Sequence, residues 1–151
     1  MRLEDEIQQH RGFRDEWEKL VLNILFTGNW INTYQHQQLK QYNLTPEQYN
    51  ILRILRGCHP EPASVNLLKE RMLNKMSNAS RLVEKLKQKG LVGRDECQND
   101  RRRVEVCITQ QGLELLHNIE RSELTPAQRF HHMDETEVKQ LNVLLDRFRE
   151  Q

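Results

Sequence analysis

The sequence predicts a mainly helical chain that carries one small β-hairpin. Apolar residues recur at helical spacing over most of the chain, and residues that suit helix N-caps precede several of these stretches. One segment, Val104–Ile108, instead alternates in the period-two pattern of a strand. The chain has 151 residues, which is enough for one compact core, whereas a second independent domain would be cramped.

The first stretch with helical periodicity runs from Phe13 to Tyr42. Gly28 interrupts its apolar stripe, but the spacing of three or four residues continues on both sides. We therefore expect one long amphipathic helix here, with an apolar stripe made of Trp17, Leu20, Val21, Ile24, Ile31 and Tyr34.

A dense helix-start signal follows at residues 44–49. Thr45 is expected to be the N-cap, Pro46 the first helical residue and Gln48 the reciprocal partner of a capping box. The apolar residues that follow cover much of the helix circumference, so this helix should be buried, and we expect it to end at Gly57. These apolar residues are Ile51, Leu52, Ile54 and Leu55.

Two further helices should follow, separated by a tight turn near Leu73 and Asn74. Ser64 can cap a short helix, and the next helix is expected over residues 76–89, where Gly90 ends it. In that second helix we expect five residues to point inward: Met76, Ala79, Leu82, Val83 and Leu86. A capped helix, a short helix, a tight turn and a helix with a polar outer face are the order of a helix-turn-helix.

The residue pattern after Gly90 predicts the hairpin and two more helical regions. Residues 91–94 and 104–108 form the strands, and Thr109 can cap a helix that contains Leu113, Leu116 and Ile119. Pro126 should interrupt or kink that region. A C-terminal helix is expected after Asp134, with an apolar stripe made of Val138, Leu141, Leu144, Leu145 and Phe148.

Positive charge is concentrated in the middle of the chain. The net charge is only +1, but residues 69–103 hold eleven Lys and Arg against five Asp and Glu. The segments on both sides are mildly acidic. This distribution favours a protein with one face that meets a polyanion.

The second helix of a helix-turn-helix lies in the major groove of DNA, where base edges present distinct donors and acceptors. The residues expected on its outer face suit this role: Asn78 could pair with adenine and Arg81 with guanine. Ser77, Ser80 and Lys85 could contact phosphates or bases. The alternative is that the basic residues merely solvate an exposed face.

An arginine cluster stands at the expected tip of the hairpin. Arg101, Arg102 and Arg103 follow Asp100, and a hairpin tip beside the recognition helix can reach the adjacent minor groove. Narrow minor grooves attract inserted arginine because they concentrate negative potential. Alternatively, Asp100 and Arg102 form only a surface ion pair.

Three segments of the sequence resemble the MarR family of bacterial regulators: LTPEQYNILRIL from Leu44, SNASRLVEKLKQKGLVGR from Ser77 and NDRRRVEVCITQQG from Asn99. MDETEVKQLNVLLDRF from Met133 is similar to the family's C-terminal dimerisation helix. The resemblance implies a winged helix-turn-helix at residues 44–109, flanked by dimerisation helices at 1–43 and 110–151. It also implies that Arg102 enters the minor groove while Asp100 orients it.

The chain departs from the family pattern at two places. It has Leu73 and Asn74 where the family often has Gly before the recognition helix, and Pro126 falls in a helix that is usually continuous. The resemblance also implies a small aromatic or lipophilic effector bound between the dimerisation region and the DNA-binding lobe. Its pocket could be lined by Trp17, Trp30, Tyr34 and His36, although aromatic residues at helical spacing are more often core.

No catalytic, metal-binding, cofactor or membrane-spanning motif is found. No apolar run approaches the roughly 20 residues of a membrane span, and the charged N-terminus is unlike a signal peptide. Three cysteines, Cys58, Cys97 and Cys107, have no paired short spacing, and the adjacent His131 and His132 have no fixed carboxylate partner. We therefore expect a cytoplasmic protein that is not an enzyme.

These expectations combine into a homodimeric transcriptional regulator that binds a pseudo-palindromic operator, represses transcription and is released by a small effector. The alternative is a helical protein–protein interaction module without DNA affinity, whose basic middle binds an acidic partner. Salt-dependent retention of a short DNA duplex would distinguish the two.

Overall fold

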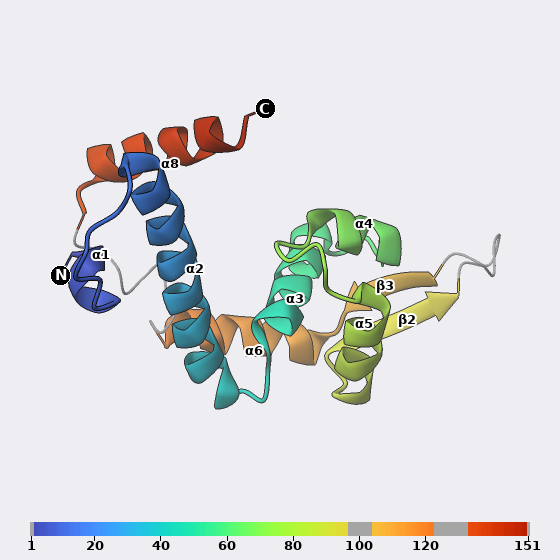
Figure 1. Ribbon diagram of the computed structural model, residues 1–151. Coiled ribbons are helices and arrows are strands. Elements are labelled where there is room, and N and C mark those ends of the chain that lie inside the picture. Colours follow the sequence, from blue (N-terminus) through green and yellow to red (C-terminus); the bar gives the residue numbers. More distant parts are fainter. Residues whose placement is uncertain (1, 97–103, 123–132, 151) are drawn as a thin grey trace.

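The computed structural model describes residues 2–96, 104–122 and 133–150 (Figure 1). Helices dominate, and one small sheet lies at the end of the molecule opposite both termini. In chain order the elements are α1 (Leu3–Glu6), α2 (Glu16–Lys40), α3 (Pro46–Cys58), β1 (Ala63–Ser64), α4 (Val65–Arg71), α5 (Ala79–Gln88), β2 (Val92–Glu96), β3 (Val104–Ile108), α6 (Gln110–Arg121) and α8 (Glu135–Arg149).

The core lies in a lobe built from α3 to α6 and the sheet. Helix α3 is its centre and contacts α4, α5, α6 and β3. The largest fully buried side chains come from each of these elements, which explains why α3 is apolar around most of its circumference. They are Ile51, Leu52, Leu55, Leu68, Met72, Val83, Leu86, Val106 and Leu116.

The sheet has three antiparallel strands in the order β1-β3-β2. Strands β2 and β3 form the expected hairpin, with Val92 paired to Ile108 and Arg94 paired to Val106. The two-residue strand β1 adds to the other edge through the pairing of Ala63 with Val106. The hairpin is thereby joined to the segment that leads into α4.

The predicted caps are confirmed. Thr45 and Gln48 form a reciprocal capping box at the start of α3, which begins at Pro46. The side chains of Ser64 and Thr109 accept backbone N–H groups at the starts of α4 and α6, as expected. Asp134, for which no capping role was predicted, does the same at the start of α8. The long N-terminal helix is also confirmed, with slightly narrower bounds than residues 13–42.

One helix start was placed too early. The recognition helix was expected from residue 76, with Met76 pointing inward, but α5 begins at Ala79 and Met76 is 93% exposed. Asn78 is the N-cap that sets this start, because its amide oxygen accepts the N–H of Arg81 at 3.0 Å. The other four residues predicted to point inward are buried or half-buried.

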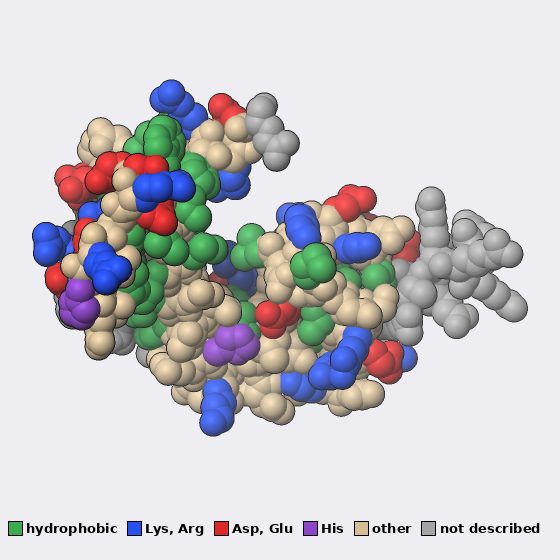
Figure 2. All heavy atoms as spheres, in the orientation of Figure 1, with side chains coloured by type: hydrophobic (Ala, Val, Ile, Leu, Met, Phe, Trp, Pro, Cys, Tyr) green, Lys and Arg blue, Asp and Glu red, His purple; other side chains and the backbone are tan. Residues whose placement is uncertain are grey.

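Helices α2 and α8 lie outside the lobe core, at the other end of the molecule (Figure 1). Of the 25 residues of α2, only Leu39 is buried, and no residue of α8 is buried. Both helices expose large apolar side chains, and Figure 2 shows hydrophobic side chains gathered at this end. No helix in the described ranges is long and apolar enough to cross a membrane.

Candidate nucleic-acid interface

Helix α5 presents a polar and basic outer face. Its inner face buries Ala79, Val83 and Leu86, so the residues between them point outward at helical spacing. Ser80, Arg81 and Lys85 are all exposed. Within the described ranges neither Arg81 nor Lys85 forms an ion pair, so both charged groups are available to a ligand.

Asn78 and Ser77 stand immediately before this helix. The amide oxygen of Asn78 caps α5, so the oxygen that bidentate pairing with adenine needs is already engaged. Its NH₂ group remains a donor. Ser77 is half-buried, and its N–H donates to the carbonyl oxygen of Asn74 at 3.2 Å. Sequence reasoning predicted Asn78 as a DNA-contacting residue but missed its capping role.

The C-terminal end of α5 is joined to the start of α6. Gly90 has a φ of +71°, which a residue without Cβ adopts at little cost. The hydroxyl of Thr109 donates to the carbonyl oxygen of Gly90 at 2.7 Å and accepts the N–H of Gly112 at 3.1 Å. A movement of α6 would therefore be transmitted to α5.

The hairpin packs beside α5, since β2 contacts this helix and pairs with β3. This is the arrangement expected of a wing next to a recognition helix. The four predicted wing residues, Asp100, Arg101, Arg102 and Arg103, lie outside the described residues, as do Pro126, Cys97, His131 and His132.

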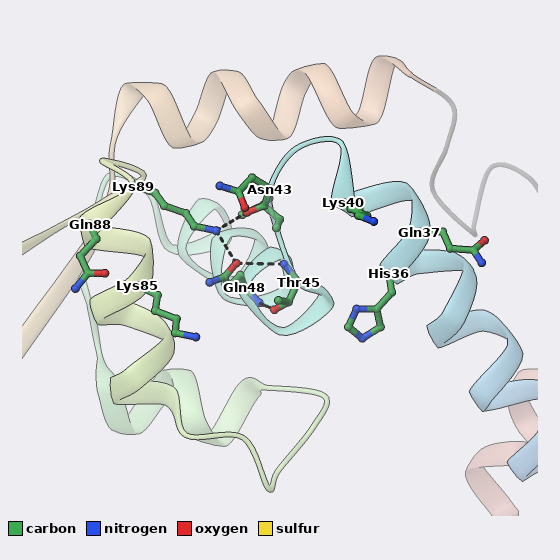
Figure 3. Close-up of a pocket in the computed structure, with 10 residues that line it drawn as sticks. His36, Gln37, Lys40, Asn43, Thr45, Gln48, Lys85, Gln88 and Lys89 are labelled. Carbon is green, nitrogen blue, oxygen red and sulfur yellow. Dashed lines mark hydrogen bonds between the residues drawn. The ribbon is translucent and has the colours of Figure 1, made fainter.

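An open pocket of about 620 Å³ lies between α2 and α5 (Figure 3). His36 from α2 and Lys85 from α5 point into the space between the two helices. The remaining lining comes from α2, the connection to α3, the first turn of α3 and the C-terminal end of α5: Gln37, Lys40, Asn43, Leu44, Thr45, Gln48, Gln88 and Lys89. Sequence reasoning missed most of this set, because α2 and α5 are distant in sequence.

Lys89 closes one side of the pocket. Its ammonium donates hydrogen bonds to the carbonyl oxygen of Asn43 and to the amide oxygen of Gln48, the latter at 3.1 Å. Burial lowers the pKa of Lys89, and the neighbouring charge of Lys85 lowers it further. Lys89 thus links the end of α5 to the segment between α2 and α3 and to the first turn of α3.

Residues 44–104 match the sequence profile of the MarR family. Among solved structures, a MarR transcription factor from Planctomyces limnophilus is 28% identical, with 89% of this chain and 98% of that chain covered and a TM-score of 0.67. Escherichia coli MarR complexed with operator DNA is 20% identical, with 92% and 99% covered and a TM-score of 0.76. CouR from Rhodococcus jostii bound to p-coumaroyl-CoA is 19% identical, with 88% and 93% covered and a TM-score of 0.70. No curated protein matches the chain.

Residues 44–104 form a MarR-family segment. MarR-family members are transcription regulators, and the mainly helical fold with its small antiparallel sheet is their winged-helix DNA-binding fold. Helix α5 and strand β2 of the interface described above lie within the matched residues 44–104.

The four aromatic residues predicted to line the MarR-type effector pocket do not converge on one site in the single chain. His36 lines the pocket, and the half-buried Tyr34 lies two residues earlier on α2. Trp17 and Trp30 are 74% and 49% exposed. Trp17 is 19 residues before His36, which places it roughly 28 Å away along a helix.

Two of the three cysteines lie in the described residues. Cys58 and Cys107 are free thiols of intermediate exposure, and a guanidinium nitrogen of Arg71 lies 3.5 Å from the sulfur of Cys58. In the portion of the chain that the structure describes, no group of His, Cys, Asp and Glu side chains could hold a metal ion.

Proposed function

We propose that the chain is a homodimeric, sequence-specific DNA-binding repressor. The observation that carries this proposal is the outer face of α5, where Ser80, Arg81 and Lys85 are exposed beside the hairpin. A bidentate guanidinium–guanine contact reads sequence, whereas an ammonium positions the protein on phosphates. The arginines at residues 101–103 supply the minor-groove contact, with Asp100 orienting Arg102.

The apolar faces of α2 and α8 support dimerisation. Leu25 is 58% exposed on α2 and Leu144 is 59% exposed on α8, and neither helix can turn these residues into the lobe core. A contiguous apolar patch of this kind marks a protein–protein interface. A second copy of the chain covers it, and the resulting two-fold symmetry places two α5 helices in successive major grooves, about 10 base pairs apart.

The pocket between α2 and α5 supports control by a small effector. Lys40, Lys85 and Lys89 gather positive charge at its walls, and His36 adds a ring on the α2 side. A flat aromatic or lipophilic acid matches this chemistry. Because Lys85 and Lys89 belong to the recognition helix, the effector would contact α5 itself and change the separation of the two helices in the dimer.

The first experiment selects duplexes from a random library with the purified protein and measures their affinity across a salt series. An inverted repeat with half-sites about 10 base pairs apart, and an affinity that falls steeply with salt, are expected. An asymmetric single half-site would contradict the dimeric docking. Absence of any duplex retention would favour the interaction module instead.

The second experiment tests the effector with benzoate and its uncharged analogue benzamide. Benzoate should release the selected duplex at lower concentration than benzamide, because only the carboxylate can pair with the lysines of the pocket. A Lys40→Met variant keeps an unbranched side chain of similar length but removes the charge. In this variant the concentrations of benzoate and benzamide that release the duplex should differ less than in the parent. Equal potency of the two compounds would exclude recognition of an acid at this pocket.

A further inference from the structure

Two apolar side chains project into solvent immediately before the recognition helix. Met76 is 93% exposed and Leu73 is 87% exposed, the highest values among the exposed large hydrophobic residues of the described chain. Figure 2 shows hydrophobic side chains among Lys and Arg on the visible face of this lobe. Neither residue lies on the α2 and α8 faces that a second copy would cover.

The backbone of this turn is held by hydrogen bonds. The side chain of Asn74 accepts the N–H of Met76 at 3.1 Å, and its carbonyl oxygen accepts the N–H of Ser77 at 3.2 Å. The N–H of Leu73 donates to the side chain of Asn50 on α3 at 2.9 Å. The exposure of Met76 therefore belongs to a defined turn.

The position of Met76 relates it to DNA. Met76 precedes the N-cap Asn78 by two residues, and a recognition helix contacts base edges with its N-terminal residues. With α5 in a major groove, the exposed side chain of Met76, two residues before the N-cap, stands on the side of the helix start that faces the base edges in the proposed docking. The apolar group that a base edge presents in the major groove is the C5-methyl of thymine.

We propose that Met76 contacts the C5-methyl group of a thymine in each operator half-site and so contributes to sequence specificity. Methionine suits this contact because its unbranched thioether chain has three rotatable bonds and adapts to a small apolar group. Leu73 is anchored to α3 and lies three residues further from α5, so it does not take part. This inference rests on the proposed DNA binding.

The test replaces each thymine of the selected duplex by deoxyuridine, which removes only the methyl group and leaves base pairing unchanged. At one thymine position in each half-site, replacement by deoxyuridine should weaken binding of the parent protein about fourfold relative to the unmodified duplex. Met76→Ala should bind the thymine and uracil duplexes equally, and Met76→Leu should restore most of the difference. Leu73→Ala, a truncation at a similarly exposed site in the same turn, should respond to uracil like the parent.

Four outcomes of the selection and deoxyuridine experiments would contradict the proposed thymine contact of Met76. A selected half-site without thymine, or a parent protein that ignores every uracil replacement, would overturn the role of Met76 while DNA binding itself stands. Met76→Ala with the full sensitivity of the parent would assign the methyl contact to another residue. A parent protein that retains no duplex would remove the proposed function and this inference together.

Discussion

Lys89 at the end of α5 and Gln48 in the first turn of α3 are joined by a 3.1 Å hydrogen bond from the ammonium to the amide oxygen. Gln48 is 3% exposed and its oxygen also accepts the N–H of Thr45. The amide oxygen of Gln48 thus accepts hydrogen bonds from both the N-cap residue of α3 and the C-cap residue of α5.

Lys89→Met should lower the free energy of unfolding by roughly 1 to 2 kcal/mol. The substitution keeps an unbranched chain but removes the donor to Gln48 and to the carbonyl oxygen of Asn43. Urea denaturation measures this change. Lys87→Met, at an exposed site on the same helix, is the control and should change stability by less than about 0.5 kcal/mol. Equal effects of the two would show that the Lys89 contacts contribute nothing.

Gly112→Ala should destabilise the lobe by roughly 1 to 3 kcal/mol. A Cβ at this position would lie 2.4 Å from the carbonyl oxygen of Leu91 and 2.7 Å from a side-chain carbon of Ile108. Gly57→Ala on α3 is the matched control, since nothing lies within 4 Å of its Cβ position, and it should stabilise by up to about 1 kcal/mol. Thermal unfolding of both variants checks the contrast, and an unaffected Gly112→Ala would refute this close approach of α6 to Leu91 and Ile108.

The ion pair between Arg56 on α3 and Glu120 on α6, at 2.7 Å, should give a pH-dependent contribution to stability. A hydrogen bond from Arg56 lowers the pKa of Glu120 from its usual value of 4.5. The contribution is therefore complete above about pH 5 and is lost as the pH falls through the lowered pKa of the folded state.

Glu120→Gln should consequently cost up to about 1 kcal/mol near neutral pH and almost nothing in acid, because the pair is partly solvated. Denaturation in urea over a pH series measures the difference. Glu114→Gln, an exposed site on the same helix, is the control and should change stability by less than about 0.5 kcal/mol near neutral pH. A Glu120→Gln deficit that grows as the pH falls would reverse the sign and contradict this assignment.

Arg81→Ala and Arg81→Lys should separate recognition of the base sequence from charge-based positioning on the DNA backbone. The alanine variant should lose about 1 to 3 kcal/mol of discrimination at one position of each half-site. The lysine variant keeps the charge but lacks the planar fork, so it should retain the salt dependence while losing most of that discrimination. Binding of base-substituted duplexes across a salt series measures both. Full specificity in the alanine variant would remove α5 from base recognition.

Replacing Leu141 and Leu144 together by Glu should convert the protein to monomers. These side chains are 44% and 59% exposed on α8, so the change costs the single chain little but places charges in the proposed interface. Light scattering should report about the chain mass of 18.2 kDa for this variant and twice that mass for the parent. Leu73→Glu is the exposed control and should stay dimeric, whereas a parent that is itself monomeric would contradict the proposed assembly.

Local chemistry made much of the fold predictable. A capping box needs only Thr45 and Gln48 three residues apart, and the period-two pattern of residues 104–108 fixes a strand without knowledge of its partners. Strand β1 was missed because Ala63 and Ser64 become a strand only through pairing with β3. The short helix α1 was missed too, since its contact depends on the ion pair of Glu4 with Lys19.

The residues of the candidate site could be predicted from the sequence only where they all lie on one helix, α5. Helical spacing correctly placed Arg81 and Lys85 on the outer face of α5. It also predicted that Met76 points inward, because periodicity alone does not reveal which residue caps the start of the helix. The pocket draws His36 and Lys89 from segments more than 50 residues apart. Such proximity is set by tertiary packing, which a single sequence does not display.

The exposure of α2 has a consequence for how the protein melts. A helix of 25 residues with Leu39 as its one buried side chain gains little free energy from its own lobe. In the proposed dimer its order comes from a bimolecular association, which follows mass action. The midpoint of thermal unfolding should therefore climb with protein concentration, and in dilute solution α2 should lose its structure before the lobe does.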